Sequence, residues 1–177
     1  KIVDFYPIGS DERQFCSPGF NLPVGSLERT LAPDFKEYHT SADNLQFVKA
    51  EFLANTFQKY IQVISKLEDN FGKITKNNQK KKNFKKKKGT FYINKNPKCE
   101  PQLGKRKLYH GIGSQIPSQG GQKIVNQFAL LWILNYSDGE HSLTDISKMS
   151  GFDLTLLENT SKLLIKSGLL EEIKNNA

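Results

Sequence analysis

A run of lysines constrains this chain more than any other feature. Residues 73–88 read KITKNNQKKKNFKKKK and contain nine lysines and no acidic residue. Such a segment cannot bury enough apolar surface to offset the entropy lost on ordering it. We therefore predict a flexible loop over residues 73–89, and any folded core must be built on either side of it.

The net charge of +8 comes from the same part of the chain. Residues 1–72 hold 7 basic and 10 acidic residues, residues 73–115 hold 14 and 1, and residues 116–177 hold 5 and 7, which gives −3, +13 and −2. Because the excess is confined to one segment, the overall charge is no evidence that the folded parts bind nucleic acid.

Outside that segment the composition is that of a globular protein, with 37% apolar residues in 177. The longest apolar run, residues 128–134, is far shorter than the roughly 18 residues that span a bilayer, so no membrane helix is expected. Cys16 and Cys99 fit neither a disulfide framework nor a metal motif, which favours a cytoplasmic location. The chain opens on an extended apolar pattern rather than a signal sequence, and we expect its native start upstream.

Residues 1–72 are predicted to form the last portion of an α/β sheet domain. Segments 2–6 and 20–27 have the pattern of strands. Asp43 or Asn44 is then expected to cap a helix that runs to about residue 69, because apolar residues recur there at three- and four-residue spacing. Strands followed by a helix are typical of a parallel or mixed sheet, which these residues are too few to complete.

The remainder is predicted to form a connector over 90–118, extended at 90–93, and a small winged-helix domain over 119–177. Its three helices are marked by local signals, and a short strand at 169–173 follows them. The signals are a capping box of Ser142 and Asp145 before the second helix, an Asp153 cap before the third, and Gly151 and Gly168 at their ends.

Metal chemistry is suggested by Tyr38-His39-Thr40, which is followed by Asp43. A histidine at the end of a strand, with an acid just after it, is a common way to hold a metal ligand at the rim of an α/β sheet. From these residues alone, a histidine satisfied by its neighbours on the surface or in the core is the more frequent case.

Longer stretches carry a family resemblance. SDERQFCSPGFNLPVGSLERT, EYHTSADN, NPKCEPQLGKR and LLWILNYSDGEHSLTDIS together resemble the bacterial aminopeptidase-like proteins associated with polysaccharide biosynthesis, which end in a winged helix. The first part is similar to the last third of a di-zinc aminopeptidase catalytic domain. The resemblance implies an α/β fold, the C-terminal part of a zinc-aminopeptidase-like sheet domain followed by a small winged helix-turn-helix domain.

The resemblance also implies roles for individual residues. His39 stands where the family has its final zinc-binding histidine. Asp11 matches an acid that borders the metal site and orients a bound water or the substrate amine. Asp43 is interpreted as the helix N-cap that fixes the loop behind His39.

Glu12 and Arg13 depart from the wider aminopeptidase pattern, which often has a histidine after Ser-Asp. A contact between Arg13 and substrate is therefore a hypothesis, and a surface ion pair with Glu12 or Glu28 is the simpler reading.

In that family two zinc ions activate a bridging water and a glutamate acts as the base. Those other ligands lie upstream of the matched region, while His110 and His141 have no ligand spacing around them. We expect the intact protein to hold two zinc ions and to act on a peptide or aminoacyl substrate, and this chain alone to be inactive.

Two other functions stay open. A winged helix can bind DNA, but this one has net charge −2 and its third helix offers only Lys162 and Lys166, so nucleic-acid binding would be nonspecific and through the lysine segment. The peptidase fold can also be kept for binding a peptide-like or amino-sugar ligand without hydrolysis. Packing within the chain or in a homo-oligomer is the preferred role of the winged helix.

Overall fold

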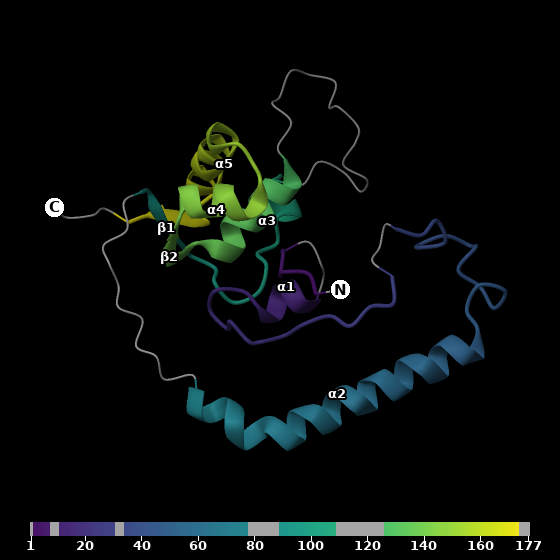
Figure 1. Ribbon diagram of the computed structural model, residues 1–177. Helices are drawn as coiled ribbons and strands as arrows, with labels where there is room; N and C mark the ends of the chain where they lie inside the picture. The colour runs from purple at the N-terminus through teal and green to yellow at the C-terminus, as the bar shows by residue number, and fades with distance from the viewer. Residues whose placement is uncertain (1, 8–10, 31–33, 78–88, 109–125, 174–177) are drawn as a thin grey trace. The chain divides into compact units, whose positions relative to one another are not determined.

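The structure is a computed structural model that describes residues 2–7, 11–30, 34–77, 89–108 and 126–173 (Figure 1). The chain divides into two compact units, one made of residues 1–26 and 86–177 and one of residues 27–85. The elements, in chain order, are α1 Asp11–Phe15, α2 Ala50–Asn77, β1 Phe91–Asn94, the 3-10 turn η1 Gly104–Arg106, α3 Gln127–Tyr136, β2 Asp138–Ser142, α4 Leu143–Ser150, α5 Leu154–Lys166 and β3 Leu170–Glu172.

The first unit is built on a three-stranded antiparallel sheet in the order β2-β1-β3. Phe91 of β1 pairs with Ser142 of β2, and Tyr92 pairs with Glu172 of β3. The extended run at 90–93 and the strand at 169–173 are confirmed, and the segment predicted as a connector supplies the central strand. β2 was not predicted, because its sequence DGEHS has the composition of a turn.

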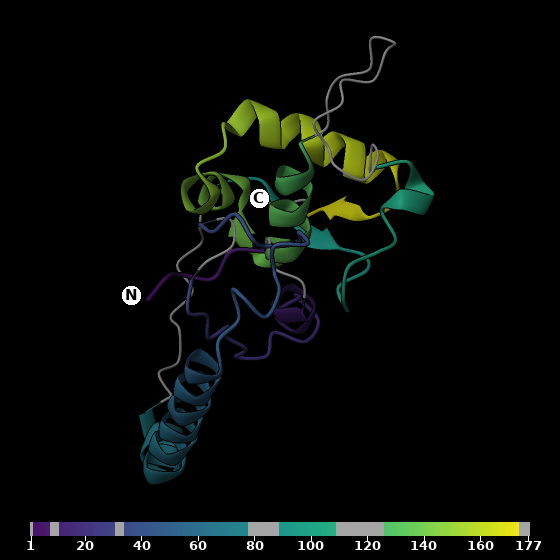
Figure 2. The same ribbon diagram turned by 90° about the vertical axis from the view of Figure 1, so that its right-hand side faces the viewer.

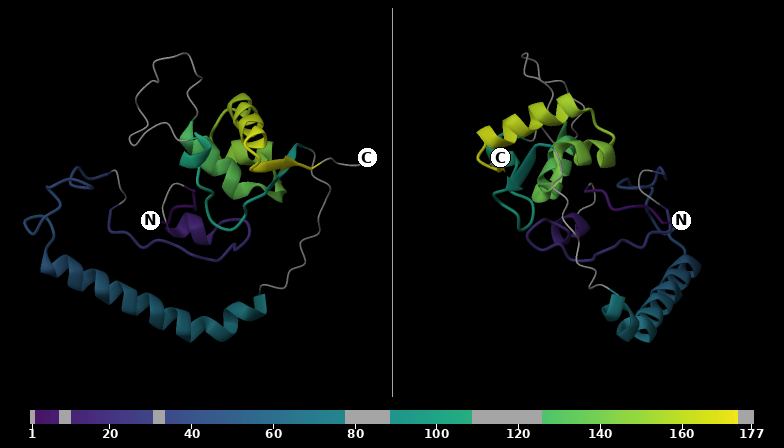
Figure 3. Two further views of the ribbon diagram at one scale, coloured as in Figure 1. Left: turned by 180° about the vertical axis from the view of Figure 1, so that it is seen from behind. Right: turned by 60° about the vertical axis from the view of Figure 1, so that its left-hand side comes forward.

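Helices α3, α4 and α5 pack together beside this sheet and enclose one apolar core (Figure 2). Leu130 and Ile133 of α3 and Leu157 and Leu164 of α5 are fully buried. Such burial stabilises the fold by about 1.5–3 kcal/mol per large side chain. The views from behind and from the side show the same helical cluster (Figure 3).

The helix ends of this unit follow their local signals. The Ser142 hydroxyl accepts a hydrogen bond from the backbone N–H of Asp145 at 3.1 Å, and an Asp145 carboxylate oxygen accepts one from the Ser142 N–H at 3.0 Å. Asp153 caps α5 by accepting from the backbone N–H of Thr155 at 2.8 Å. Gly151 has φ 74° at the end of α4, a conformation that costs other residues about 1–2 kcal/mol. The predicted capping box and caps are confirmed.

The second unit contains α2, a single helix of 28 residues (Figure 1). It begins at Ala50, so the prediction that Asp43 caps it is wrong. The Asn44 side chain instead accepts from the backbone N–H of Gln46 at 2.8 Å and starts one isolated turn. Short polar side chains compete in this way with helix formation.

The strands predicted at 2–6 and 20–27 are absent, since the structure assigns neither segment to a strand. A strand needs a hydrogen-bonding neighbour, and within the described ranges the only sheet is the antiparallel one of the first unit. The fold class nevertheless stands as a mixture of helices and a small sheet.

The lysine segment is partly helical, because residues 73–77 belong to α2. Residues 78–88, where the rest of the flexible loop was predicted, lie outside the described residues. The predicted domain boundaries at 72, 89 and 118 stay predictions. Among the helices that the structure describes, none is long and apolar enough to cross a membrane.

Candidate functional site

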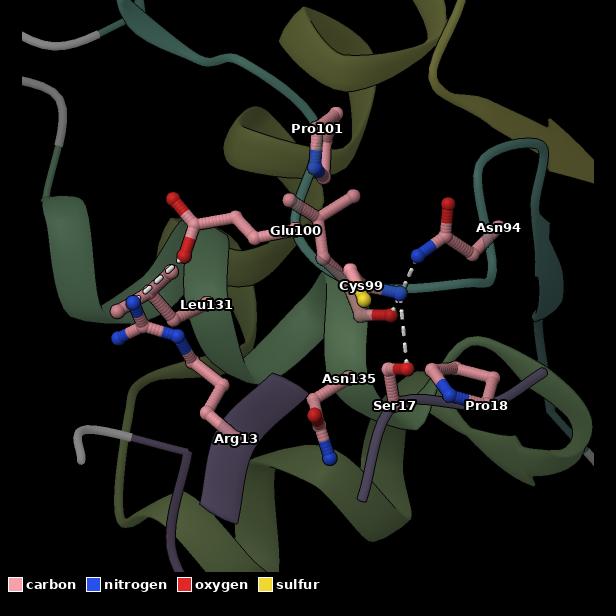
Figure 4. A pocket seen from close by; sticks show the side chains of 10 residues that line it. Arg13, Ser17, Pro18, Asn94, Cys99, Glu100, Pro101, Leu131 and Asn135 are labelled. Atoms are coloured by element: carbon pink, nitrogen blue, oxygen red, sulfur yellow. Dashed lines mark hydrogen bonds and ion pairs between the residues drawn. The ribbon is translucent and has the colours of Figure 1, made fainter. Parts of the chain in front are cut away.

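Arg13 of α1 forms an ion pair with Glu100, which lies in the segment after β1 (Figure 4). The Arg13 Nη2 atom lies 2.6 Å from the Glu100 Oε2 atom, and the side chains are only 18% and 14% exposed. An ion pair was thus predicted with the wrong partner, since Glu100 rather than Glu12 or Glu28 binds the guanidinium. A contact of Arg13 with substrate stays a prediction.

Three backbone contacts strengthen this connection. Gln14 Oε1 accepts from the Glu100 N–H at 2.6 Å, and Ser17 Oγ accepts from the Cys99 N–H at 3.0 Å. The Gly19 N–H donates to the Pro97 carbonyl at 2.8 Å. We call this set of contacts the clasp; its members are Arg13, Gln14, Ser17, Gly19, Pro97, Cys99 and Glu100.

Gly19 shows how closely the clasp is packed. A Cβ atom at this position would lie 3.0 Å from the Pro97 carbonyl oxygen and 2.9 Å from Lys98 Cγ. A side chain at residue 19 would therefore push the two segments apart.

A cavity of about 20 Å³ lies beside the clasp, lined by Arg13, Asn94 and Asn135 among others (Figure 4). This is room for about one water molecule. The Asn94 side chain donates to the Leu134 carbonyl at 2.8 Å, so it holds the end of α3. The clasp is thus a packed joint between α1 and the winged-helix region, and the cavity is too small to accept a peptide.

His39 lies in the second unit and is exposed. Its backbone has φ 58°, an uncommon left-handed conformation, and its ring stacks on Tyr38 with centroids 3.9 Å apart. Asp11, exposed in the first turn of α1, belongs to the first unit. The proposed roles of both residues stay predictions.

Tyr38 connects His39 to an aromatic cluster. Phe35 meets Tyr38 edge-on at 5.6 Å and stacks on Phe47 at 5.8 Å. These rings line a hollow of about 650 Å³ together with Arg29 and residues at the start of α2. Its volume and apolar lining are those of small-molecule sites.

The hollow also contains an oriented cation. The Arg29 guanidinium lies 4.8 Å from the centre of the Phe52 ring and donates to Asn55 Oδ1 at 2.8 Å. The ring quadrupole attracts the cation, and the hydrogen bond fixes its direction. The lining also includes Lys49 and Glu28, so the hollow offers a ligand aromatic faces, two cations and one carboxylate.

A metal centre is not formed by the described residues alone. No group of three His, Cys, Asp or Glu side chains that could hold a metal occurs among them. Since a catalytic zinc normally has three protein ligands, His39 could contribute one ligand only if further ligands come from elsewhere.

A polar pair in the first unit was missed by sequence reasoning. The His141 Nδ1 atom lies 2.8 Å from an Asp138 carboxylate oxygen, and the His141 ring meets Tyr136 edge-on at 5.2 Å. Burial, and next the neighbouring Cys16, raise the pKa of the Tyr136 hydroxyl above its usual value. The only signal was the spacing Asp138-x-x-His141, which many turns share.

The outer face of α5 is a poor match to DNA. Asp153 caps the N-terminus of this helix, and Glu158 is exposed about one turn into it. In a DNA-bound helix-turn-helix, the recognition helix, here α5, lies in the major groove. Its N-terminal residues contact the base edges and lie close to the phosphates. Acidic side chains at that position repel the DNA backbone.

Comparisons with known proteins divide the chain near the lysine segment. The family model of a domain of unknown function, DUF4910, matches residues 1–70. A winged helix-turn-helix family model matches residues 90–172. The winged helix is thereby confirmed, with β1 inside it, and the clasp joins the two matched regions.

The chain is also similar along almost its whole length to a Clostridium acetobutylicum protein named for polysaccharide biosynthesis and an aminopeptidase-like domain. The two are 42% identical over 170 residues, which is 96% of this chain and 33% of the relative. A crystal structure of a C. acetobutylicum protein named as a peptidase is 39% identical, covers 96% of this chain and 31% of that one, and has a TM-score of 0.36. The chain spans about a third of the length of these relatives.

Proposed function

We propose that the chain works as part of a zinc-dependent aminopeptidase-like hydrolase whose active site includes residues beyond the described ones. The observation that supports this most is the 42% identity, over 96% of the chain, to a protein with an aminopeptidase-like domain. In the proposal, His39 supplies one zinc ligand, and the substrate is a peptide or an aminoacyl compound.

The surroundings of His39 support a ligand role. The side chain is exposed, and the Tyr38 ring against which it stacks limits its orientations. Holding a ligand in one orientation before the metal arrives lowers the entropic cost of binding. Asp11 would act on a bound water or on the substrate amine, as the resemblance implies.

The clasp has a positioning role in this proposal. It ties α1, which carries Asp11, to the segment that follows β1 of the winged helix. The winged helix then serves to hold α1 of the hydrolase part in place. A role in packing rather than in DNA binding agrees with the acidic residues at the start of α5.

The aromatic hollow favours a second candidate, the binding of a peptide-like ligand without hydrolysis. Its volume of about 650 Å³ and its Arg29 cation suit an apolar residue next to a carboxylate. Binding without turnover would identify this second function.

The test is a chimera in which this chain replaces the matched third of the C. acetobutylicum relative. Zinc content is measured by mass spectrometry, and turnover is measured with aminoacyl chromogenic substrates. We expect the chimera to bind zinc and to be active, and the isolated chain to show no turnover with added zinc.

Two matched variants then address the ligand. His39→Ala in the chimera should lose at least one zinc equivalent, because a missing ligand costs large affinity. His141→Gln, a histidine held by Asp138 in the other unit, should keep all the zinc. Unchanged zinc in His39→Ala would remove His39 from the site, and a chimera and parent that both lack zinc would overturn the hydrolase proposal.

A further inference from the structure

One face of α2 carries apolar side chains that are exposed. We call them the α2 stripe: Phe57, Tyr60, Ile61, Ile64, Leu67 and Phe71, with exposed fractions of 66%, 47%, 48%, 53%, 56% and 71%. None of them lines the aromatic hollow, which ends at Thr56. Contiguous exposed apolar surfaces of this kind mark interaction sites.

The width of the α2 stripe shows what kind of surface would cover it. With 100° per residue, its members fall within an arc of about 120°, and the half-exposed Val63 widens it to about 160°. A two-stranded coiled coil uses a narrower seam with aliphatic residues at its core positions. The broad aromatic and aliphatic face instead fits a packed layer, such as a sheet or a pair of helices.

An acidic residue within the arc of the α2 stripe disfavours a lipid surface. Helices that lie on membranes carry Lys and Arg along the polar face. Helix α2 holds four lysines, which lie outside the arc of the stripe, and three acidic residues, of which Glu68 lies within that arc. An acidic side chain at that place would be repelled by anionic lipid.

We propose that the α2 stripe packs against an apolar layer of an aminopeptidase-like body, the part that corresponds to the two-thirds of the C. acetobutylicum relative outside the match. This body is the expected partner of the stripe because the relative is three times as long as the matched region, which includes α2. The proposal concerns packing alone and requires neither zinc nor hydrolysis.

The test compares the isolated chain with the same chimera by cysteine labelling. Ile64→Cys places a thiol on the stripe, and Gln62→Cys places one on the opposite side of α2; maleimide labelling is read peptide by peptide, which separates them from Cys16 and Cys99. We expect Ile64→Cys to label at least about 10-fold more slowly in the chimera than in the isolated chain, and Gln62→Cys to label equally in both.

A pair of charge variants supplies a second measurement. Ile64→Glu should lower the melting temperature of the chimera and leave that of the isolated chain unchanged, whereas Gln62→Glu, with the same new charge, should change neither. Equal labelling of Ile64→Cys in both proteins would overturn the proposal. It would also be overturned if the isolated chain protected this thiol as a dimer in light scattering, or only with anionic phosphatidylserine vesicles.

Because labelling and melting do not depend on zinc or turnover, a chimera without activity still tests the packing. Protection in a chimera that lacks zinc, when its parent also lacks zinc, would refute the hydrolase proposal alone. Zinc and activity without protection would refute the packing proposal alone.

Discussion

Helices α2 and α5 share an amphipathic pattern but differ in what covers their apolar faces. In α5, Leu157 and Leu164 are 0% exposed, because α3, α4 and the sheet surround them. In α2, Ile64 is 53% exposed. The winged-helix region therefore has its own buried core. The apolar face of α2, in contrast, is exposed. Periodicity identifies such a face but does not identify its partner.

The largest expected effect separates these two helices directly. Leu164→Ala should lower the free energy of unfolding by about 2–5 kcal/mol, because it leaves a cavity in a closed core. Ile64→Ala should change it in the isolated chain by less than about 0.5 kcal/mol, as for other surface substitutions. Urea denaturation followed by Trp132 fluorescence reports the winged-helix core, and its far-ultraviolet circular dichroism reports the helix content that α2 contributes. Similar losses in the two variants would show that α2 is packed after all.

The next effect concerns the clasp. Glu100→Gln leaves the Arg13 guanidinium without its carboxylate in a largely enclosed place, and we expect a loss of roughly 2–3 kcal/mol in unfolding free energy. Glu171→Gln is a matched control, because its pair with Lys95 is exposed and spans 3.5 Å, and it should cost less than about 0.5 kcal/mol. Equal costs would mean that the clasp adds no stability.

Sequence reasoning succeeded where the signals were local. The capping box of Ser142 and Asp145, the Asp153 cap and Gly151 act within one or two helical turns, and each lies where it was predicted. It failed where the decisive contact was distant. Arg13 finds Glu100 across 87 positions, and no spacing rule selects that partner over the nearby Glu12.

The same reasoning explains the missing strands and the displaced helix start. Residues 2–6 and 20–27 have strand-like side chains, but backbone pairing requires a neighbour that the local sequence does not specify. Asp43 and Asn44 have the chemistry of caps, and Asn44 uses it for a single turn. The candidate site was predicted by family resemblance, because one histidine carries too little information by itself.

A smaller effect tests the capping box at the start of α4 in the winged-helix region. Ser142→Ala removes the hydroxyl that accepts from Asp145 and should cost about 1 kcal/mol of unfolding free energy. Thr144→Ala, an exposed position in the same helix, is the control and should be close to neutral. If both variants unfold like the parent in urea, the capping box does not stabilise α4.

The smallest effect is on alkaline stability. Burial, and next the charge of Glu172, raise the pKa of the Tyr92 hydroxyl above its usual value. The folded state then disfavours the phenolate form of Tyr92. The contribution of this group to the free energy of unfolding is therefore fully present below the unfolded pKa of about 10 and is lost as the pH rises above it. Tyr92→Phe should flatten this decline in melting temperature between pH 9 and pH 11, each pH being about one unit from that value. An identical decline in the variant would assign it to other groups.

Amide hydrogen exchange of the isolated chain tests most directly whether the winged-helix region has a closed core and α2 lacks a packing partner. We predict that amides of α3 and α5 around Leu130 and Leu164 exchange only through global unfolding, and that those of α2 around Ile64 exchange at least about 100-fold faster through local opening. Protection of α2 equal to that of α5 in the monomeric chain would contradict the account, because it would show that the α2 face already has its partner.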